Sequence, residues 1–359
     1  MWAEMGLAYN SRPSRWKRGA LFLNVFSMSM TKRRNRVKAE PLVLLIGSGI
    51  LREILGPAWR CSPLASWEVL LRCTAMKSEI PASVLCVRSL ATAWEAMVLH
   101  GLRNGFRNSA GRWIEPLKLP SASASSVDRA LRAVCRSTIV HASRGLKPLY
   151  RSHEIIVQLR EVIKQRPIHL VDFNFDSLVC EGVDVKLSAG KASHGWNQNL
   201  GLSAAEHAAL FRSWSIKEGS SRVWKPHGWL GPAASLRLGV RDFGLQGGAY
   251  RWAFGLYKAT ERGYRQQESS GTVTWIASVM KHECRSFGLG IGPDEWGLRW
   301  LLIQRDREQA RKKRPQPFTI FRSPKDPPPL GASCADFESW SYAAQAVLDA
   351  SFDVRNVPH

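Results

Sequence analysis

The chain has 359 residues, of which 51 are Lys or Arg and 29 are Asp or Glu, so its formal net charge is +22. Its hydrophobic content of 45% is too high for a wholly disordered protein and is enough for a sizeable core. The positive charge indicates polyanionic partners, chiefly nucleic acid or acidic surfaces, and carries no information about the fold. Seven widely spaced cysteines argue against a disulfide framework or a zinc ribbon and favour a reducing, intracellular compartment.

Arginine and tryptophan are unusually frequent, with 35 Arg against 16 Lys and 15 Trp against 6 Tyr. GC-rich codons tend to produce this bias, and so does a reading frame that was never selected to encode a protein. In foldable sequences local propensity, hydrophobic pattern and turn chemistry agree with one another, and here they agree only in parts of the chain. An unselected reading frame with no evolved molecular function is therefore one hypothesis for this sequence.

Residues 1–40 are expected to form a basic disordered tail or a targeting segment. Residues 5–39 contain no acid and carry serines between basic residues, which is the composition of an organelle transit peptide. The run TKRRNRVK is also typical of nuclear import signals and of phosphate-binding segments, through Lys32, Arg33, Arg34 and Arg36. The same residues can serve as a nuclear or an organellar targeting signal, and we expect a nuclear location in preference to an organellar one.

Residues 41–118 form a poorly defined region of apolar runs and basic breaks. Its longest apolar run, at 41–51, predicts a core strand or helix and is about half of the ~20 residues that a membrane span needs, so no transmembrane segment is expected. Gly47 and Gly49 follow the run as in a dinucleotide-binding turn, but that turn requires a third glycine where Arg52 stands.

Two further segments precede the central region. Residues 87–102 carry apolar side chains at four-residue steps, which predicts an amphipathic helix. The Ser/Ala-rich stretch 119–128 is expected to be a linker.

Residues 129–314 are expected to be the most compact α+β region. Helices are predicted over 125–142 and 153–165, and short strands with turns over 219–275. At 168–179 the pattern changes to a two-residue period, in which Asp172 and Asp176 alternate with apolar residues, and this predicts a half-buried strand with solvated carboxylates. A helix is predicted over 202–216, because Ser203 and Glu206 have the spacing of a capping box.

The strand and helix of this region, with Asp172, Asp176 and Glu206, resemble the opening of a ribonuclease H-like nuclease. In that family the first strand supplies an aspartate and the first helix a glutamate, and the resemblance implies metal-dependent phosphodiester cleavage, which needs carboxylates that converge on divalent cations. The next segment, SSRVWKPHGWL at 220–230, should form a strand with another acid, but it contains none. The nuclease is an alternative hypothesis, and otherwise no catalytic residue, metal site or cofactor is indicated.

The stretch RDREQARKKRPQP ends a helix that is expected to begin at Pro293. The pattern predicts a solvated helix end with an ion pair between Glu308 and Lys312, since the two residues are four apart. Its consecutive basic residues also suit an import receptor or nucleic acid, and these contact residues are Arg311, Lys312, Lys313 and Arg314.

Residues 315–336 form a proline-rich connector, and residues 337–359 are expected to contain a C-terminal helix and tail. The sequence as a whole predicts a helix-dominated, mixed α+β fold with substantial irregular or disordered segments. Its expected function is at most non-specific binding of nucleic acid or acidic surfaces through Arg/Lys clusters, and an enzymatic activity is not favoured.

Overall fold

The computed structural model describes most of the chain from Glu40 onward, and this part is one compact unit. The basic run 31–38, Glu206 and the predicted C-terminal helix lie outside the described residues. The described residues are 40–87, 89–116, 122–185, 191–192, 207, 211–216, 221–229, 235–261, 274–290, 295–322 and 333–336.

Helices make up most of the described structure, which confirms the predicted helix-dominated, mixed α and β fold. The α-helices are α1 (Gly49–Leu55), α2 (Trp67–Lys77), α3 (Leu90–Asn104), α4 (Ala122–Arg144), α5 (Lys147–Ser152), α6 (Glu154–Gln165), α7 (Leu178–Gly182), α9 (Val240–Glu261), α10 (Trp275–Lys281) and α11 (Trp296–Ala310). Two short 3₁₀ helices accompany them, η1 (Gly56–Cys61) and η2 (Ala82–Leu85).

Eight strands form one sheet in the order β10-β9-β8-β1-β4-β7-β6-β5. All neighbours from β10 to β7 are parallel, and β6 and β5 extend the sheet with antiparallel pairing. The chain moves outward from β1 to β4 and β7, then returns to the other side of β1 for β8, β9 and β10, which is the strand order of doubly wound α/β sheets. The strands are β1 (Leu42–Ile46), β4 (Ile168–Asp172), β5 (Lys191–Ala192), β6 (Arg212–Ser215), β7 (Arg222–Trp224), β8 (Cys284–Phe287), β9 (Phe318–Arg322) and β10 (Ser333–Asp336), and a separate hairpin pairs β2 (Phe106–Arg107) with β3 (Trp113–Ile114).

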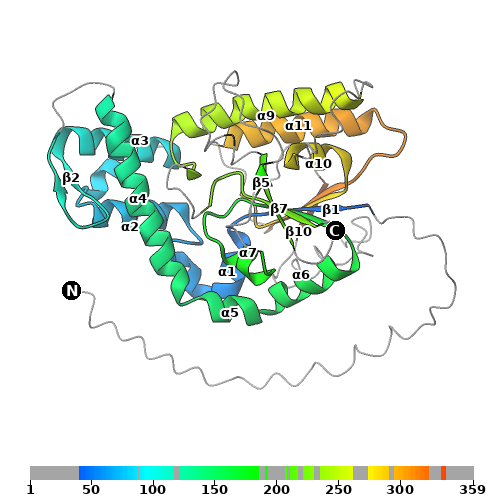
Figure 1. Cartoon of the computed structure of the whole chain (residues 1–359), viewed down its shortest axis with the longest axis horizontal. Coiled ribbons are helices and arrows are strands. Elements are labelled where there is room, and N and C mark those ends of the chain that lie inside the picture. The colour runs from blue at the N-terminus through cyan, green and yellow to red at the C-terminus, as the bar shows by residue number, and fades with distance from the viewer. Residues whose placement is uncertain are drawn as a thin grey trace. The chain divides into compact units, whose positions relative to one another are not determined.

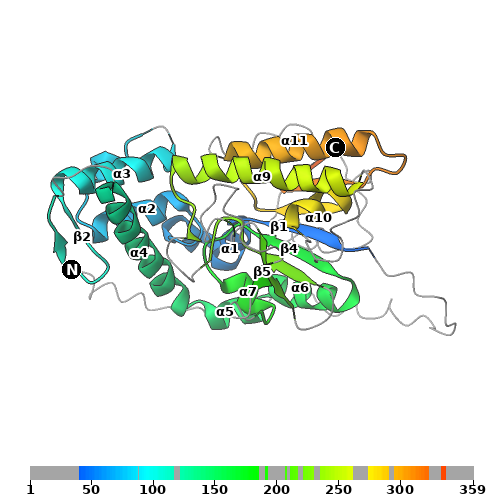
Figure 2. The ribbon, with the colours of Figure 1, turned by 45° about the horizontal axis from the view of Figure 1, so that its top comes forward.

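The sheet is covered on both faces, and β1 shows why its five residues are all apolar. Leu42, Leu44 and Ile46 face a core shared with α1 to α7, whereas Val43 and Leu45 face a second core shared with α9, α10 and α11. Figures 1 and 2 show α9, α10 and α11 on one side of the sheet and α1, α5, α6 and α7 on the other, with α2, α3 and α4 beside the sheet at one end. A central parallel strand buried on both faces needs an unbroken apolar run rather than an alternating one.

Several predicted elements differ from the observed ones. Residues 122–128 of the expected linker form the first turns of α4, because its long apolar face packs on α2 and α3. Residues 212–215 of the helix expected over 202–216 are strand β6, which pairs with β7. Residues 240–261, expected as short strands, are the helix α9, and α9 packs on α10 and α11.

A close backbone crossing joins the ends of the central strands β1 and β8. The amide of Gly47 donates to the carbonyl of Phe287, and the amide of Gly49 donates to that of Gly288, each at 3.0 Å. A Cβ atom on Gly49 would lie 2.2 Å from the Cα of Gly288, so only glycine fits there. Ligands of doubly wound sheets bind where the strand order reverses, and here the amides of Gly47 and Gly49 at that place are already bonded to backbone carbonyls of the chain.

Replacing Gly49 by alanine should destabilise the protein, since the new Cβ meets backbone and not a flexible side chain. We expect a loss of about 2–3 kcal/mol in the free energy of unfolding, measured by urea denaturation. Gly248→Ala is the matched control, because Gly248 is exposed in α9 and has no atom near its Cβ position. That variant should gain about 0.5–1 kcal/mol, and equal losses in both variants would contradict the crossing as described.

Candidate functional site

The two aspartates of the predicted strand are buried, which corrects the expectation that they are solvated. Strand β4 ends at Asp172, and residues 173–177 form a loop that turns back over the end of the sheet. Asp172 and Asp176 are 0% and 1% exposed. The two-residue pattern was misleading because both sides of this end of β4 are buried. Tyr150 of α5 and Cys180 of α7 lie near the two aspartates, and the ring of Phe173 packs on His227 and Trp275.

Lys225 binds Asp172 in this buried cluster. Its ammonium nitrogen Nζ lies 2.7 Å from Oδ2 of Asp172, and both side chains are fully buried. Nζ also donates to the backbone carbonyl of Asp176 at 2.5 Å. Because Lys225 directly follows β7 and Asp172 ends the neighbouring parallel strand β4, the register of the two strands places their side chains together.

This lysine stands in the segment where the nuclease resemblance required a further acid. A divalent cation at Asp172 would have to compete with the ammonium already bound there, and Asp176 is not solvent-accessible. Among the described residues no group of three His, Cys, Asp or Glu side chains has the arrangement of a metal site. The described part of the cluster therefore does not support two-metal cleavage.

Asp176 has an unusual environment within the cluster. Its Oδ1 accepts a hydrogen bond from the amide of Leu178 at 2.8 Å, whereas its buried Oδ2 accepts none. Burial raises the pKa of Asp176 to about 6, and the nearby Lys225 ammonium opposes that rise. Burial also raises the pKa of the Cys180 thiol to about 12 and raises that of the Tyr150 phenol. The cluster thus combines one ion pair with a carboxyl group that gains a proton easily.

The basic stretch at the end of α11 is less solvated than predicted. Arg305 is 1% exposed, and its guanidinium donates to the backbone carbonyls of Val279, His282, Gln316 and Pro317. These bonds attach α11 to the end of α10 and to the segment that leads into β9. Arg305 is therefore a structural residue of the core and not part of a solvated helix end.

The predicted pair between Glu308 and Lys312 is also absent. Glu308 is buried and binds Lys258 of α9 and Arg311. Lys312 instead donates to the carbonyl of Met280 at the end of α10, at 3.3 Å. Packing against α9 and α10 thus decides these contacts, and helical spacing alone does not.

The remaining cations of the stretch form an exposed basic edge, composed of Lys281, Arg311, Lys312, Lys313 and Arg314. Lys281 ends α10 directly before β8, and the other four follow α11 and precede β9. All except the half-buried Lys312 are exposed. Burial lowers the pKa of the His282 imidazole, Glu40 opposes this, and the charges of Lys281 and Lys312 lower it further.

Two of the acids near the basic edge are already paired, whereas a third, Glu40, lies near His282 and accepts a hydrogen bond from Gln316 at 3.4 Å. Glu283 binds Arg285 at 2.7 Å and lies 3.8 Å from Arg166, and Glu308 binds Lys258 and Arg311. Within the described part of the chain, no ion pair connects Lys281, Lys313 or Arg314 to an acid. The edge, with five basic residues, therefore keeps a net positive charge.

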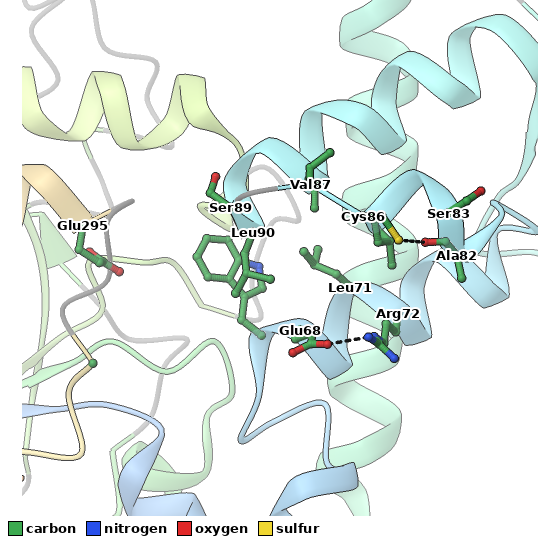
Figure 3. A pocket seen from close by; sticks show the side chains of 14 residues that line it. Glu68, Leu71, Arg72, Ala82, Ser83, Cys86, Val87, Ser89, Leu90 and Glu295 are labelled. Atoms are coloured by element: carbon green, nitrogen blue, oxygen red, sulfur yellow. Dashed lines mark hydrogen bonds and ion pairs between the residues drawn. The ribbon is translucent and has the colours of Figure 1, made fainter. Parts of the chain in front are cut away.

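A cavity of about 650 Å³ lies between α2, η2 and α3 and reaches Glu295 before α11. Figure 3 shows its mostly apolar walls, with Glu68 held by Arg72 at 2.7 Å on one side and Glu295 across from them. Nε2 of His227 lies 3.3 Å from Glu295, outside the alignment of a hydrogen bond. The volume suits a small molecule, but the described lining residues bring no nucleophile and base together.

Sequence reasoning missed Lys225, Arg305 and Lys281 as determinants of these sites. Lys225 was detectable, because it directly follows the short strand β7, just as Asp172 stands at the end of β4. Arg305 and Lys281 gave no separate signal, because their roles depend on how α10 and α11 pack.

Among the described residues, no helix combines the length and apolar character of a membrane span.

Replacing Arg305 by methionine should be strongly destabilising, because it leaves backbone carbonyls in the core without their donor. We expect a loss of about 3–5 kcal/mol in the free energy of unfolding by urea. Arg311→Met, in the same helix end, should change it by less than about 0.5 kcal/mol, because the side chain of Arg311 is 73% exposed. Similar losses in the two variants would contradict this division between core and surface arginines.

His169 should make the protein sensitive to acid. Its Nδ1 lies 2.9 Å from the Ser278 hydroxyl, and its pKa is lowered from 6.5 to about 4 by burial and by the positive charges of His282 and Arg222. The folded state therefore favours neutral imidazole, and this stabilisation is complete above pH 6.5 and lost as the pH falls toward 4. The wild-type chain should lose about 3 kcal/mol over that range through His169.

The His169→Asn variant should lose less stability over the same range, measured by urea unfolding at both ends of it. The exposed His141→Asn is the control and should follow the wild type. A pH dependence unchanged in His169→Asn would show that other groups cause the acid sensitivity.

The described residues thus present a closed, buried ion-pair cluster at the carboxyl ends of β4 and β7, an apolar cavity, and an exposed basic edge. No protein-family model matches the chain, and neither a curated protein nor a solved structure matches it.

Proposed function

We propose that the chain binds nucleic acid without sequence specificity, through the basic edge and the basic run that contains Lys32, Arg33, Arg34 and Arg36. The observation that carries the proposal is the exposed positive charge of Lys281, Lys313 and Arg314 on a chain of net charge +22. Of the nearby acids, Glu283 and Glu308 are bound by other cations, and Glu40 offsets only part of the charge of the basic edge. Phosphates would replace water around these side chains and release condensed counterions.

Two residues of α11, Arg305 and Trp300, are not available to bind nucleic acid. Arg305 makes four backbone hydrogen bonds and is not available to a ligand. Trp300 packs against the second core and so does not offer its ring for base stacking. Binding should therefore rest on phosphate contacts, with little preference for base sequence or for single strands.

An import receptor is the second candidate partner, because it reads short basic runs of the same kind. It would place the protein in the nucleus, which agrees with nucleic-acid binding there. Receptor binding requires an extended segment, whereas Lys312 is tied to Met280. This favours the run at 31–38 as the address and the basic edge as the phosphate contact.

Salt dependence tests the nucleic-acid proposal. The full chain should bind duplex DNA of unrelated sequences with similar affinity, and the affinity should fall steeply as salt rises. The triple variant K281Q/K313Q/R314Q should reduce the slope of log affinity against log salt by about 3, one unit for each lost phosphate contact. Fluorescence anisotropy over a salt series measures both quantities.

A triple variant on the other side of the sheet is the matched control. R103Q/R129Q/R144Q removes the same charge from exposed positions on α3 and α4. If both variants lower the slope equally, binding depends on the net charge of the chain, and the basic edge is not a specific binding site. Absence of binding at low salt would refute the proposal and favour the hypothesis of a chain without a selected activity.

A further inference from the structure

The buried cluster holds an amine and a carboxylate in contact, shielded from water. Nζ of Lys225 lies 2.7 Å from Oδ2 of Asp172. Since a carbon–oxygen bond is about 1.2 Å long, the carboxyl carbon Cγ of Asp172 lies within about 4 Å of Nζ. This is close to the separation of about 3–3.5 Å from which bound groups react.

The backbone fixes this approach from both sides. Asp172 closes β4 and Lys225 follows β7, and these strands pair in parallel through Val171 and Trp224. The carbonyl of Asp176 holds Nζ at 2.5 Å, so the amine has few other orientations. Orientation of this kind supplies much of the effective concentration of an intramolecular reaction.

Burial makes the separated charges costly. Removing an ammonium and a carboxylate from water is costly for each ion. Burial lowers the pKa of Lys225, but Asp172 and Asp176 raise it by more, so the pair depends on their mutual attraction. An amide bond between the two groups would replace both charges by a neutral unit. The released water would leave for the solvent, so the dry site favours condensation more than water does.

A second carboxyl group is available for proton transfer. Oδ2 of Asp176 is buried and accepts no hydrogen bond, and Asp176 lies close enough to Lys225 and Asp172 for their charges to affect its pKa. Tyr150 and Cys180 also face the cluster, and burial raises the pKa of both, so they stay neutral. Asp176 is therefore the acid–base group nearest to the pair that can change its protonation.

We propose that Lys225 and Asp172 condense to form an intramolecular isopeptide bond. The ammonium first gives a proton to the Asp172 carboxylate, which leaves a neutral amine and a neutral acid. The amine lone pair attacks Cγ, an N–C bond forms, and a C–O bond breaks as hydroxyl leaves. Asp176, in its protonated form, gives a proton to the leaving hydroxyl and takes one from the nitrogen, so one water is released and nothing is oxidised or reduced.

The mass of the purified full chain tests the proposal directly. The intact mass should be lower than the sequence mass by one water molecule, and proteolysis should yield a branched peptide that joins the segments around Asp172 and Lys225. The branched peptide distinguishes this bond from a cyclic imide at another aspartate, which also loses water. Resistance of the buried Cys180 to alkylation shows in the same sample that the cluster is folded.

Asp176→Asn tests the role of the third carboxyl group. It keeps an oxygen to accept from the Leu178 amide but cannot relay a proton, so bond formation should slow by about 100-fold. Asp184→Asn is the matched control, since Asp184 is exposed and its positive φ of 58° suits asparagine. In the wild type, the bond should form faster below pH 6 than above it, because Asp176 is then protonated.

The proposal would be overturned if the chain kept its full sequence mass after long incubation on both sides of pH 6 while Cys180 stayed protected. Lys225 and Asp172 would then form an ion pair only. Equal rates in Asp176→Asn and the wild type would remove Asp176 from the reaction as written. Neither result depends on nucleic-acid binding, which the basic edge determines separately.

Discussion

The contact between Lys225 and Asp172 is the constraint on which the centre of the sheet depends. Both charged groups are fully buried, so each requires the other, and β4 and β7 must end in the register that brings them together. The loop after β4 must also return, because the carbonyl of Asp176 completes the shell around the ammonium. One lysine thereby fixes two strand ends and the start of α7, at a place where hydrophobic packing alone would allow other registers.

Arginines perform a related role on both faces of the sheet. Arg132 of α4 binds Asp128 and Asp242 and thus ties α4 to the start of α9. Arg305 ties α11 to α10 through backbone carbonyls. A high arginine content is therefore not in itself a measure of surface charge. The fraction left exposed decides which partners the chain can attract, and it includes Arg311 and Arg314 after α11 as well as arginines of α3 and α4.

The sequence predicted the elements whose signal is local. β1 is an unbroken apolar run, α3 shows four-residue steps, and α6 begins with an acid in its first turn. It failed where a distant partner decides the outcome. The burial of Asp172 depends on Lys225, 53 residues further on, and β6 is a strand because β7 lies beside it. Helical spacing likewise predicted an ion pair between Glu308 and Lys312. In the structure Glu308 binds Lys258 of α9, and Lys312 donates to the carbonyl of Met280 in α10.

The two edges of the parallel sheet have opposite characters, and this explains where binding is expected. At the carboxyl edge, where doubly wound sheets usually bind ligands, the amides of Gly47 and Gly49 are bonded to β8 and its following residue, and the Lys225 ammonium is bound by Asp172. At the amino edge, Lys281 and Lys312 precede β8 and β9, and the neighbouring acid Glu283 is bound by Arg285. Charge that the fold does not use internally therefore remains at the amino edge, and a polyanion would meet it there without any rearrangement of the core.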